Sequence, residues 1–380
     1  KVISAAQLRC RNILGFLLLV AGYLKVQDNT ALLETIAYIT WIPTIVQSFV
    51  IDTLPWIELL VGSFLMLGVF NVLVGAKQAY RVQDELNRTQ ESARFAAEFI
   101  ARDMRMAGFR GCRAALPLTL MVNNAATDWR FNLDRPLNGF QGVANYPAQL
   151  SDPFSNAAHD PDAIAILTVD DSRTRAIQAE AAGQLTLASQ HDYAQGEVLL
   201  AANCESGSLF QVSADNSGTT TLRHEVSAGL NPGNCANRLG GNCATPVPSG
   251  IDHNGSVMPL RARAYYLSVD LNGIPGLYRA QVRAGGVVDR DELVPGVEDM
   301  RVLYGQDLDG DGIPNRYFRP TDTGFDPNLA VSAQIIFLVR TLIQPDAQVK
   351  PYRFDGVDYT PSDGHVRREV RMTIGLRNRL

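Results

Sequence analysis

An acidic, glycine-rich segment at residues 307–315 has the residue types and spacing of a calcium-binding loop. The candidate ligands and the turn glycine stand at loop positions 1, 3, 5, 6 and 9: Asp307, Asp309, Asp311, Gly312 and Asn315. Calcium prefers carboxylate and amide oxygens, and this loop type needs glycine at its sixth position. Position 12, usually a bidentate Glu, is Phe318, so Asp322 or Asp326 would have to act as a distant ligand. The alternative is an acidic turn stabilised by hydrogen bonds from side chains to the backbone.

Glu58 is the one charged residue in the apolar run Leu54–Ala76, which is long enough to cross a bilayer. A carboxylate within a membrane helix costs about 2.5–3.5 kcal/mol, so we expect a partner for its charge. The alternative is that Glu58 lies near the membrane surface and is hydrated there.

Four cysteines follow the apolar front of the chain: Cys112, Cys204, Cys235 and Cys243. An even number in a domain that faces an oxidising compartment predicts two disulfides. We expect Cys112–Cys204, which would pin the end of a long helix to a strand, and Cys235–Cys243, which would close a small loop. The alternatives are reduced cysteines or a metal site, but the sequence has no C-x-x-C pair.

The sequence has no recognisable catalytic motif, and we expect a protein that is not an enzyme. Its five histidines are scattered, and we expect them at the surface or in loops: His159, His191, His224, His253 and His365. A net charge of −5 excludes a general nucleic-acid binder. A basic cluster near the C-terminus could contact DNA, but its alternation with apolar residues favours one exposed face of a strand: Arg367, Arg368, Arg371, Arg377 and Arg379.

Three apolar runs, Ile13–Leu24, Ile36–Val50 and Leu54–Ala76, occupy the front of the chain, where charged residues are few. If all three cross a membrane, the cations before the first run place the N-terminus in the cytoplasm and residues after Ala76 outside. These cations are Lys1, Arg9 and Arg11. Membrane lipid is therefore an expected partner.

From Lys77 to Met106 the spacing predicts an amphipathic continuation of the third run, to give a helix of about 50 residues. Gly108 and Gly111 mark its end. Arg102, Asp103 and Arg105 could form a patch that faces a partner, although a solvated charged face is the simpler interpretation.

The remainder of the chain predicts strands separated by loops rich in Gly, Asn, Ser and Pro. The expected strands are Ala163–Val169, Glu197–Ala201, Leu209–Ser213, Arg263–Val269, Gly276–Ala280, Met300–Gly305, Val331–Leu342 and Arg368–Leu376. The long loop Ser227–Gly255 holds two of the cysteines.

Several separated motifs resemble type IV pilins, and specifically the PilW-like minor pilins. They are residues 57–61, 76–84, 92–96, 101–112, 265–266, 276–279, 296–305 and 367–379. The resemblance spans about residues 56–380. It implies an α+β fold in which membrane helices precede a pilin-like long helix packed on an antiparallel β-sheet domain.

The resemblance also implies a structural minor pilin that takes part in type IV pilus assembly, in a priming or tip complex, and supports adhesion, twitching motility or DNA uptake. Its partners would be other minor pilins, the major pilin and the inner-membrane assembly platform. The globular domain would be periplasmic before assembly and would join the pilus afterwards. In that family an acid equivalent to Glu58 pairs with the N-terminal amine of a neighbouring subunit. Here that amine requires cleavage between Thr53 and Leu54, where the family has glycine followed by Phe or Met.

Residues 8–68 resemble the DoxX/MauE family of small membrane proteins, through residues 18–25 and 54–62. The overlap of the two resemblances at Ile57–Gly62 implies a fused or misjoined junction. We therefore expect a membrane segment at 1–53, a pilin-like helix at 54–110 and a β-rich domain at 111–380. The alternative function is a DoxX/MauE-like protein that supports periplasmic redox chemistry or disulfide maturation.

Overall fold

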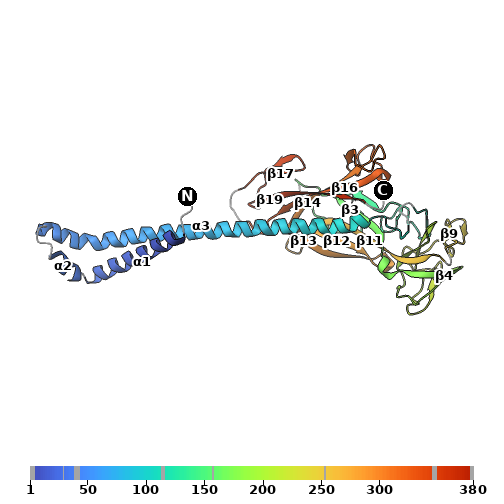
Figure 1. Cartoon of the computed structure of the whole chain (residues 1–380), viewed down its shortest axis with the longest axis horizontal. Coiled ribbons are helices and arrows are strands. Elements are labelled where there is room, and N and C mark those ends of the chain that lie inside the picture. Colours follow the sequence, from blue (N-terminus) through green and yellow to red (C-terminus); the bar gives the residue numbers. More distant parts are fainter. Residues whose placement is uncertain are drawn as a thin grey trace. The chain divides into compact units, whose positions relative to one another are not determined.

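The computed structural model describes residues 5–28, 30–37, 43–112, 116–155, 158–251, 254–344 and 349–376. Lys1, His253, Arg377 and Arg379 lie outside the described residues. The chain divides into two compact units, Lys1–Asp84 and Glu85–Leu380. Unit 1 is helical, and unit 2 contains the β-sheets together with the last part of the longest helix (Figure 1).

Unit 1 contains α1 (Ala5–Gln27), α2 (Thr30–Ala37) and the first part of α3 (Thr44–Met106). The run Ile36–Val50 does not form an element of its own, because α2 ends at Ala37 and residues from Thr44 belong to α3. Pro43 precedes α3 and its carbonyl accepts the first amide bonds of the helix. By length and composition, α3 is the one helix in the described part that could cross a membrane.

Helices α1 and α3 pack closely and antiparallel, and glycines make the close approach possible. A Cβ atom at Gly22 would lie 2.9 Å from the Leu59 Cγ atom. A Cβ atom at Gly62 would lie 2.9 Å from the Leu19 Cγ atom, and Gly15 lies near Leu65. Small residues at such positions let two apolar helices approach each other's backbones. Lys25, in the last turn of α1, therefore lies beside Glu58 of α3.

Unit 2 is built from strands in several sheets (Figure 1). The strands are β1 (Leu118–Leu120), β2 (Leu137–Phe140), β3 (Ala163–Val169), β4 (Arg175–Ala181), β5 (Gln184–Leu187), β6 (Val198–Ala202), β7 (Gly207–Gln211), β8 (Thr221–Arg223), β9 (Gly240–Gly241), β10 (Pro246–Val247), β11 (Ser256–Val269), β12 (Pro275–Val282), β13 (Val288–Pro295), β14 (Val297–Gln306), β15 (Arg316–Phe318), β16 (Ala330–Arg340), β17 (Tyr352–Phe354), β18 (Val357–Tyr359) and β19 (Arg367–Gly375). All eight expected strands are present: β3 has the expected bounds, β11 begins seven residues before the expected start, and the other six differ by one to three residues at their ends.

The largest sheet has the order β1-β7-β6-β11-β4-β5-β8, and β11 also pairs with β3 and β12. β2 extends this sheet beside β3, and β13 extends it beside β12. A second sheet has the order β15-β14-β16-β19. The pairs are antiparallel except for β1 with β7. β11 is long because its first residues pair with β6 and its later ones with β3 and β12.

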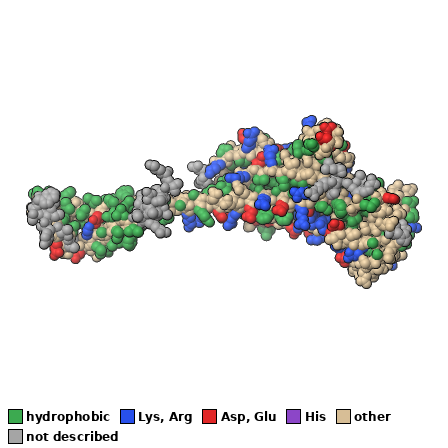
Figure 2. Space-filling model, in the orientation of Figure 1, with side chains coloured by type: hydrophobic (Ala, Val, Ile, Leu, Met, Phe, Trp, Pro, Cys, Tyr) green, Lys and Arg blue, Asp and Glu red, His purple; other side chains and the backbone are tan. Residues whose placement is uncertain are grey.

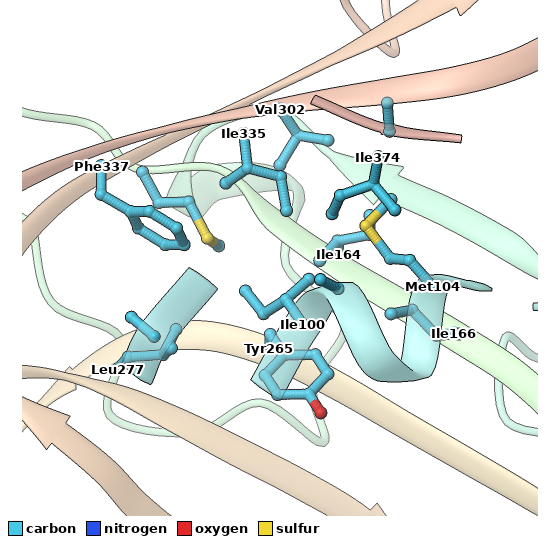
Figure 3. Packing of buried hydrophobic residues seen from close by; sticks show 14 of the residues in the cluster. Ile100, Met104, Ile164, Ile166, Tyr265, Leu277, Val302, Ile335, Phe337 and Ile374 are labelled. Atoms are coloured by element: carbon cyan, nitrogen blue, oxygen red, sulfur yellow. The ribbon is translucent and has the colours of Figure 1, made fainter. Parts of the chain in front are cut away.

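The last turns of α3 pack on strands of both main sheets in one hydrophobic core. Ile100 of α3 lies between Tyr265 and Ile335, and the Met104 side chain lies beside Ile374 (Figure 3). Both helix residues are fully buried. The helix ends where the sequence predicts, since Gly108 adopts a positive φ of 73° and its amide donates to the Leu167 carbonyl of β3. This core is the reason why the amphipathic part of α3 belongs to unit 2.

Candidate functional site

The carboxylate of Glu58 is paired within the chain. The Lys25 ammonium of α1 donates to the Glu58 Oε1 atom at 2.6 Å, and the Glu58 side chain is 16% exposed. The other carboxylate oxygen, Oε2, is buried without a hydrogen-bond partner among the described residues. Sequence reasoning missed Lys25 as the partner because the two residues are 33 positions apart. The sequence feature that could have identified the partner is the single lysine directly after the first apolar run, because an acid in an apolar helix needs an opposite charge.

The bond between Thr53 and Leu54 lies inside α3, well after its first residue. The Thr53 hydroxyl donates to the Phe49 carbonyl, a bond typical of a threonine within a helix. Pro55 follows inside the same helix. The candidate cleavage site is therefore in regular helical backbone.

The structure joins the cysteines in the pairs that the sequence favours. Cys112 is bonded to Cys204, with their Cα atoms 5.2 Å apart, and Cys235 to Cys243, with their Cα atoms 5.4 Å apart. The first bridge connects the segment after α3 with the turn between β6 and β7. It spans 92 residues, so it restrains the unfolded chain strongly.

The acidic loop brings its three carboxylates together. Ligand atoms of Asp307, Asp309 and Asp311 all lie within 4.8 Å of one another. Asp307 accepts the amides of residues 309, 310 and 312, and the bond from Gly312 is the main cause of a lowered pKa at this carboxyl. Asn315 donates its side-chain amide to Asp309. The loop therefore folds around Asp307 through the same bonds that define an Asx-stabilised turn.

The twelfth-position ligand is missing from this arrangement. Phe318 belongs to β15 and is buried. Asp322 accepts the amide of Arg319, and Asp326 caps a short 3-10 helix through the Asn328 amide. Neither distant carboxylate completes the cluster, so the loop offers three carboxylates and one amide without a bidentate Glu.

Asp103 connects α3 to β11, a contact that sequence reasoning missed. Its two carboxylate oxygens accept from the Arg263 guanidinium at 2.9 Å each, and the Tyr265 hydroxyl donates to Oδ2 at 2.7 Å. Burial is the main cause of a raised pKa at Tyr265. Its neighbours Arg102 and Arg105 are exposed instead. The expectation of a solvated patch thus holds for the arginines and is wrong for Asp103.

Three histidines, His159, His191 and His224, are buried although each lies in a loop between strands, so the expectation of surface or loop positions holds for the loops and not for the surface. His159 bonds Asp299 at 2.9 Å and the Tyr352 hydroxyl at 2.7 Å, and both His159 and Asp299 are buried. His191 is buried beside Tyr193. Neither ring nitrogen of His224 has a partner among the described residues, and burial lowers its pKa to about 4.

Two of the five arginines of the C-terminal basic cluster, Arg367 and Arg371, pair with acids of the same chain. Arg367 binds Glu298 and Asp363, and the bond from Arg367 lowers the pKa of Asp363 to about 2. Arg371 pairs with Glu369. Residues Arg367–Gly375 form β19, the strand that the alternation of basic and apolar residues predicts.

One comparison with known proteins finds a relative for part of the chain. Residues 264–378 match the family of the type IV pilus-assembly protein W, PilW. No curated protein and no solved structure matches the chain. The match does not extend to residues 8–68, so the DoxX/MauE resemblance stays a prediction. The matched segment covers less than a third of the chain, from the end of β11 through β19, and it is similar to proteins of type IV pilus assembly.

Proposed function

We propose that this chain is a structural minor pilin that takes part in type IV pilus assembly and has no catalytic activity of its own. The observation that carries the proposal is the PilW match at residues 264–378, which includes strands that bury α3. β12, β14, β16 and β19 of the matched segment supply side chains to the core around Ile100 and Met104. Strands of the PilW-like segment thus bury their apolar face against a long helix, which fits a pilin subunit.

The proposed location follows from α3 and the disulfides. α3 is long and apolar enough to anchor the chain in the inner membrane. The two cysteine pairs fit an oxidising compartment, which favours a periplasmic place for unit 2. The proposed partners are other minor pilins, the major pilin and the inner-membrane assembly platform.

We also propose that α1 holds Glu58 in a form that is not available for assembly. In the resembling family this acid pairs with the amine of a neighbouring subunit, whereas here Lys25 already neutralises it. An amine from another subunit would have to displace Lys25 before it could bind. The chain that retains α1 should therefore stay in the membrane and assemble poorly.

A second candidate function has one observation in its favour. Unit 1 is compact by itself, with α1 and α3 packed through Gly15, Gly22 and Gly62. Such a helical unit fits a DoxX/MauE-like membrane protein that supports periplasmic redox chemistry or disulfide maturation, with unit 2 as its passenger.

The experiment that separates the two candidates is affinity purification of the full-length chain from membranes of the cells that produce it. The pilin proposal expects other minor pilins and assembly-platform proteins in the eluate. A wild-type level of pili in a deletion strain, together with slow thiol oxidation of exported proteins, would support the second candidate instead.

A further inference from the structure

A groove lies beside the last turns of α3, on the face of β11 and β12 that the helix leaves uncovered. It has a volume of about 570 Å³. Side chains two residues apart on a strand share a face, so Arg261 and Arg263 lie on the same face of β11 as Tyr265. Tyr265 belongs to the core beneath α3, and the two arginines extend that face into the groove. Arg279 lies opposite Tyr265 on β12. The face that is apolar beneath α3 therefore becomes rich in arginine where α3 ends.

The lining carries more positive than negative charge, although the whole chain is acidic. Five arginines and three aspartates line the groove: Arg102, Arg105, Arg261, Arg263, Arg279, Asp103, Asp170 and Asp171. Arg263 is engaged by Asp103, and Arg261 by Asp170. Arg102 is exposed and has no ion-pair partner among the residues that the structure describes. Figure 2 shows basic side chains gathered at this end of α3.

Apolar side chains on α3 continue this surface. Phe95, Phe99 and Met106 are exposed on the helix, with Phe95 49% exposed. Their spacing of four and seven residues places them on one side of the helix, away from the buried Ile100 and Met104. Arginine, aromatic residues and methionine are the types enriched at the centres of protein interfaces. The surface thus fits a segment that carries both carboxylates and aliphatic side chains.

The loop at residues 307–313 has that composition. Asp309 and Asp311 are exposed, and Leu308 and Ile313 are 57% and 63% exposed. No residue of this loop lines the groove of its own chain. The loop therefore presents two carboxylates and two aliphatic side chains to solvent, which is complementary to the arginines and apolar side chains around the groove.

We propose that the 307–313 loop of one copy docks in the α3–β11–β12 groove of a second copy. The carboxylates of the loop would face Arg102 and Arg105, while Leu308 and Ile313 would pack near Phe99 and Met106. The two surfaces differ, so the contact is heterologous and can repeat from copy to copy. This inference concerns self-association and does not depend on the proposed role in pilus assembly.

The test is sedimentation velocity of the full-length, disulfide-intact chain in detergent micelles, at low and high salt. Wild type should self-associate, and an increase from about 0.05 to 0.5 M NaCl should weaken the association because salt screens exposed charges. The double variants Arg102→Glu/Arg105→Glu and Asp309→Lys/Asp311→Lys should each raise the dissociation constant at least about ten-fold. A chain that carries all four changes should recover to within about three-fold, because the charges are again complementary.

The control is Arg353→Glu, a reversal of an exposed arginine on β17 that lies outside the groove lining. It should associate like wild type, and melting curves should show that all variants remain folded. A wild-type chain that stays monomeric at 100 µM overturns the proposal, since about that affinity is the least a specific contact needs. Loss of association in the groove variant alone, without rescue in the four-change chain, also overturns it and indicates that a different acidic segment of the chain occupies the groove.

Discussion

Replacement of Asp103 by Asn should loosen the attachment of α3 to β11. Asp103 and Arg263 have side chains 13% and 18% exposed, and two N–H···O bonds of 2.9 Å join them. The substitution keeps the size of the side chain but leaves a mostly buried guanidinium without its counter-charge. Loss of one partner of a buried ion pair costs about 3–5 kcal/mol. Because both groups retain some contact with water, we expect a loss of about 2–3 kcal/mol from the free energy of unfolding.

The assay is equilibrium urea unfolding of the full-length chain in detergent, followed by tryptophan fluorescence and far-UV circular dichroism. Glu98→Gln is the matched control, because Glu98 is an exposed acid on the same helix and should change stability by less than about 0.5 kcal/mol. The double variant Asp103→Asn/Arg263→Gln should recover part of the loss, since no unpaired charge remains. Equal stability of Asp103→Asn and wild type would refute the reasoning that this pair holds the helix on the sheet.

Three further predictions concern the acidic loop, acid stability and processing. Calcium at 1 mM should stabilise the chain by no more than about 1 kcal/mol because a bidentate ligand is missing, and Asp309→Ala should abolish the effect; a melting temperature that is the same in EGTA and in calcium would exclude the site. His224 has a pKa lowered to about 4 by burial, so its neutral ring favours folding above about pH 6.5 and this contribution is lost as the pH falls towards 4. His224→Leu should flatten this part of the pH–stability curve, and an unchanged slope would contradict the assignment. Intact-mass measurement should show no cleavage between Thr53 and Leu54, whereas the change of residues 53–56 to Gly-Phe-Thr-Leu should permit it; a mature wild-type N-terminus at Leu54 would show the opposite.

The parts of the fold that follow from local periodicity could be predicted. The run AIAILTV at Ala163–Val169 is β3 with the same bounds, because a buried strand is a short continuous apolar run. Gly108 ends α3 since only glycine readily adopts its positive φ. The strands β4 and β13 were not predicted, because their exposed faces are charged and they lack a clear apolar alternation.

Other features depend on contacts between distant residues, which one-dimensional patterns do not contain. Lys25 and Glu58 meet because glycines let α1 and α3 approach each other. The second and third apolar runs also belong largely to one continuous helix, α3, which packs antiparallel to α1. From the sequence alone, Asp103 is expected to be a solvated charge on the helix, whereas in the structure it pairs with Arg263 of β11.

The candidate site was predictable in residue type and less so in role. The two disulfide pairs were expected from the elements that the cysteines follow, and the three clustered carboxylates from their spacing along the chain. The buried positions of His159, His191 and His224 do not, because a histidine has no fixed preference for core or surface.

The most direct test of a role in pilus assembly is the amount of surface pili on cells that lack this chain. Pili sheared from the deletion strain should be strongly reduced, and expression of the wild-type chain with its α3 core intact should restore them. A variant with Ile100→Asp, which places a charge in the core between α3 and the sheets, should fail to restore them. A normal quantity of pili in the deletion strain would contradict the account.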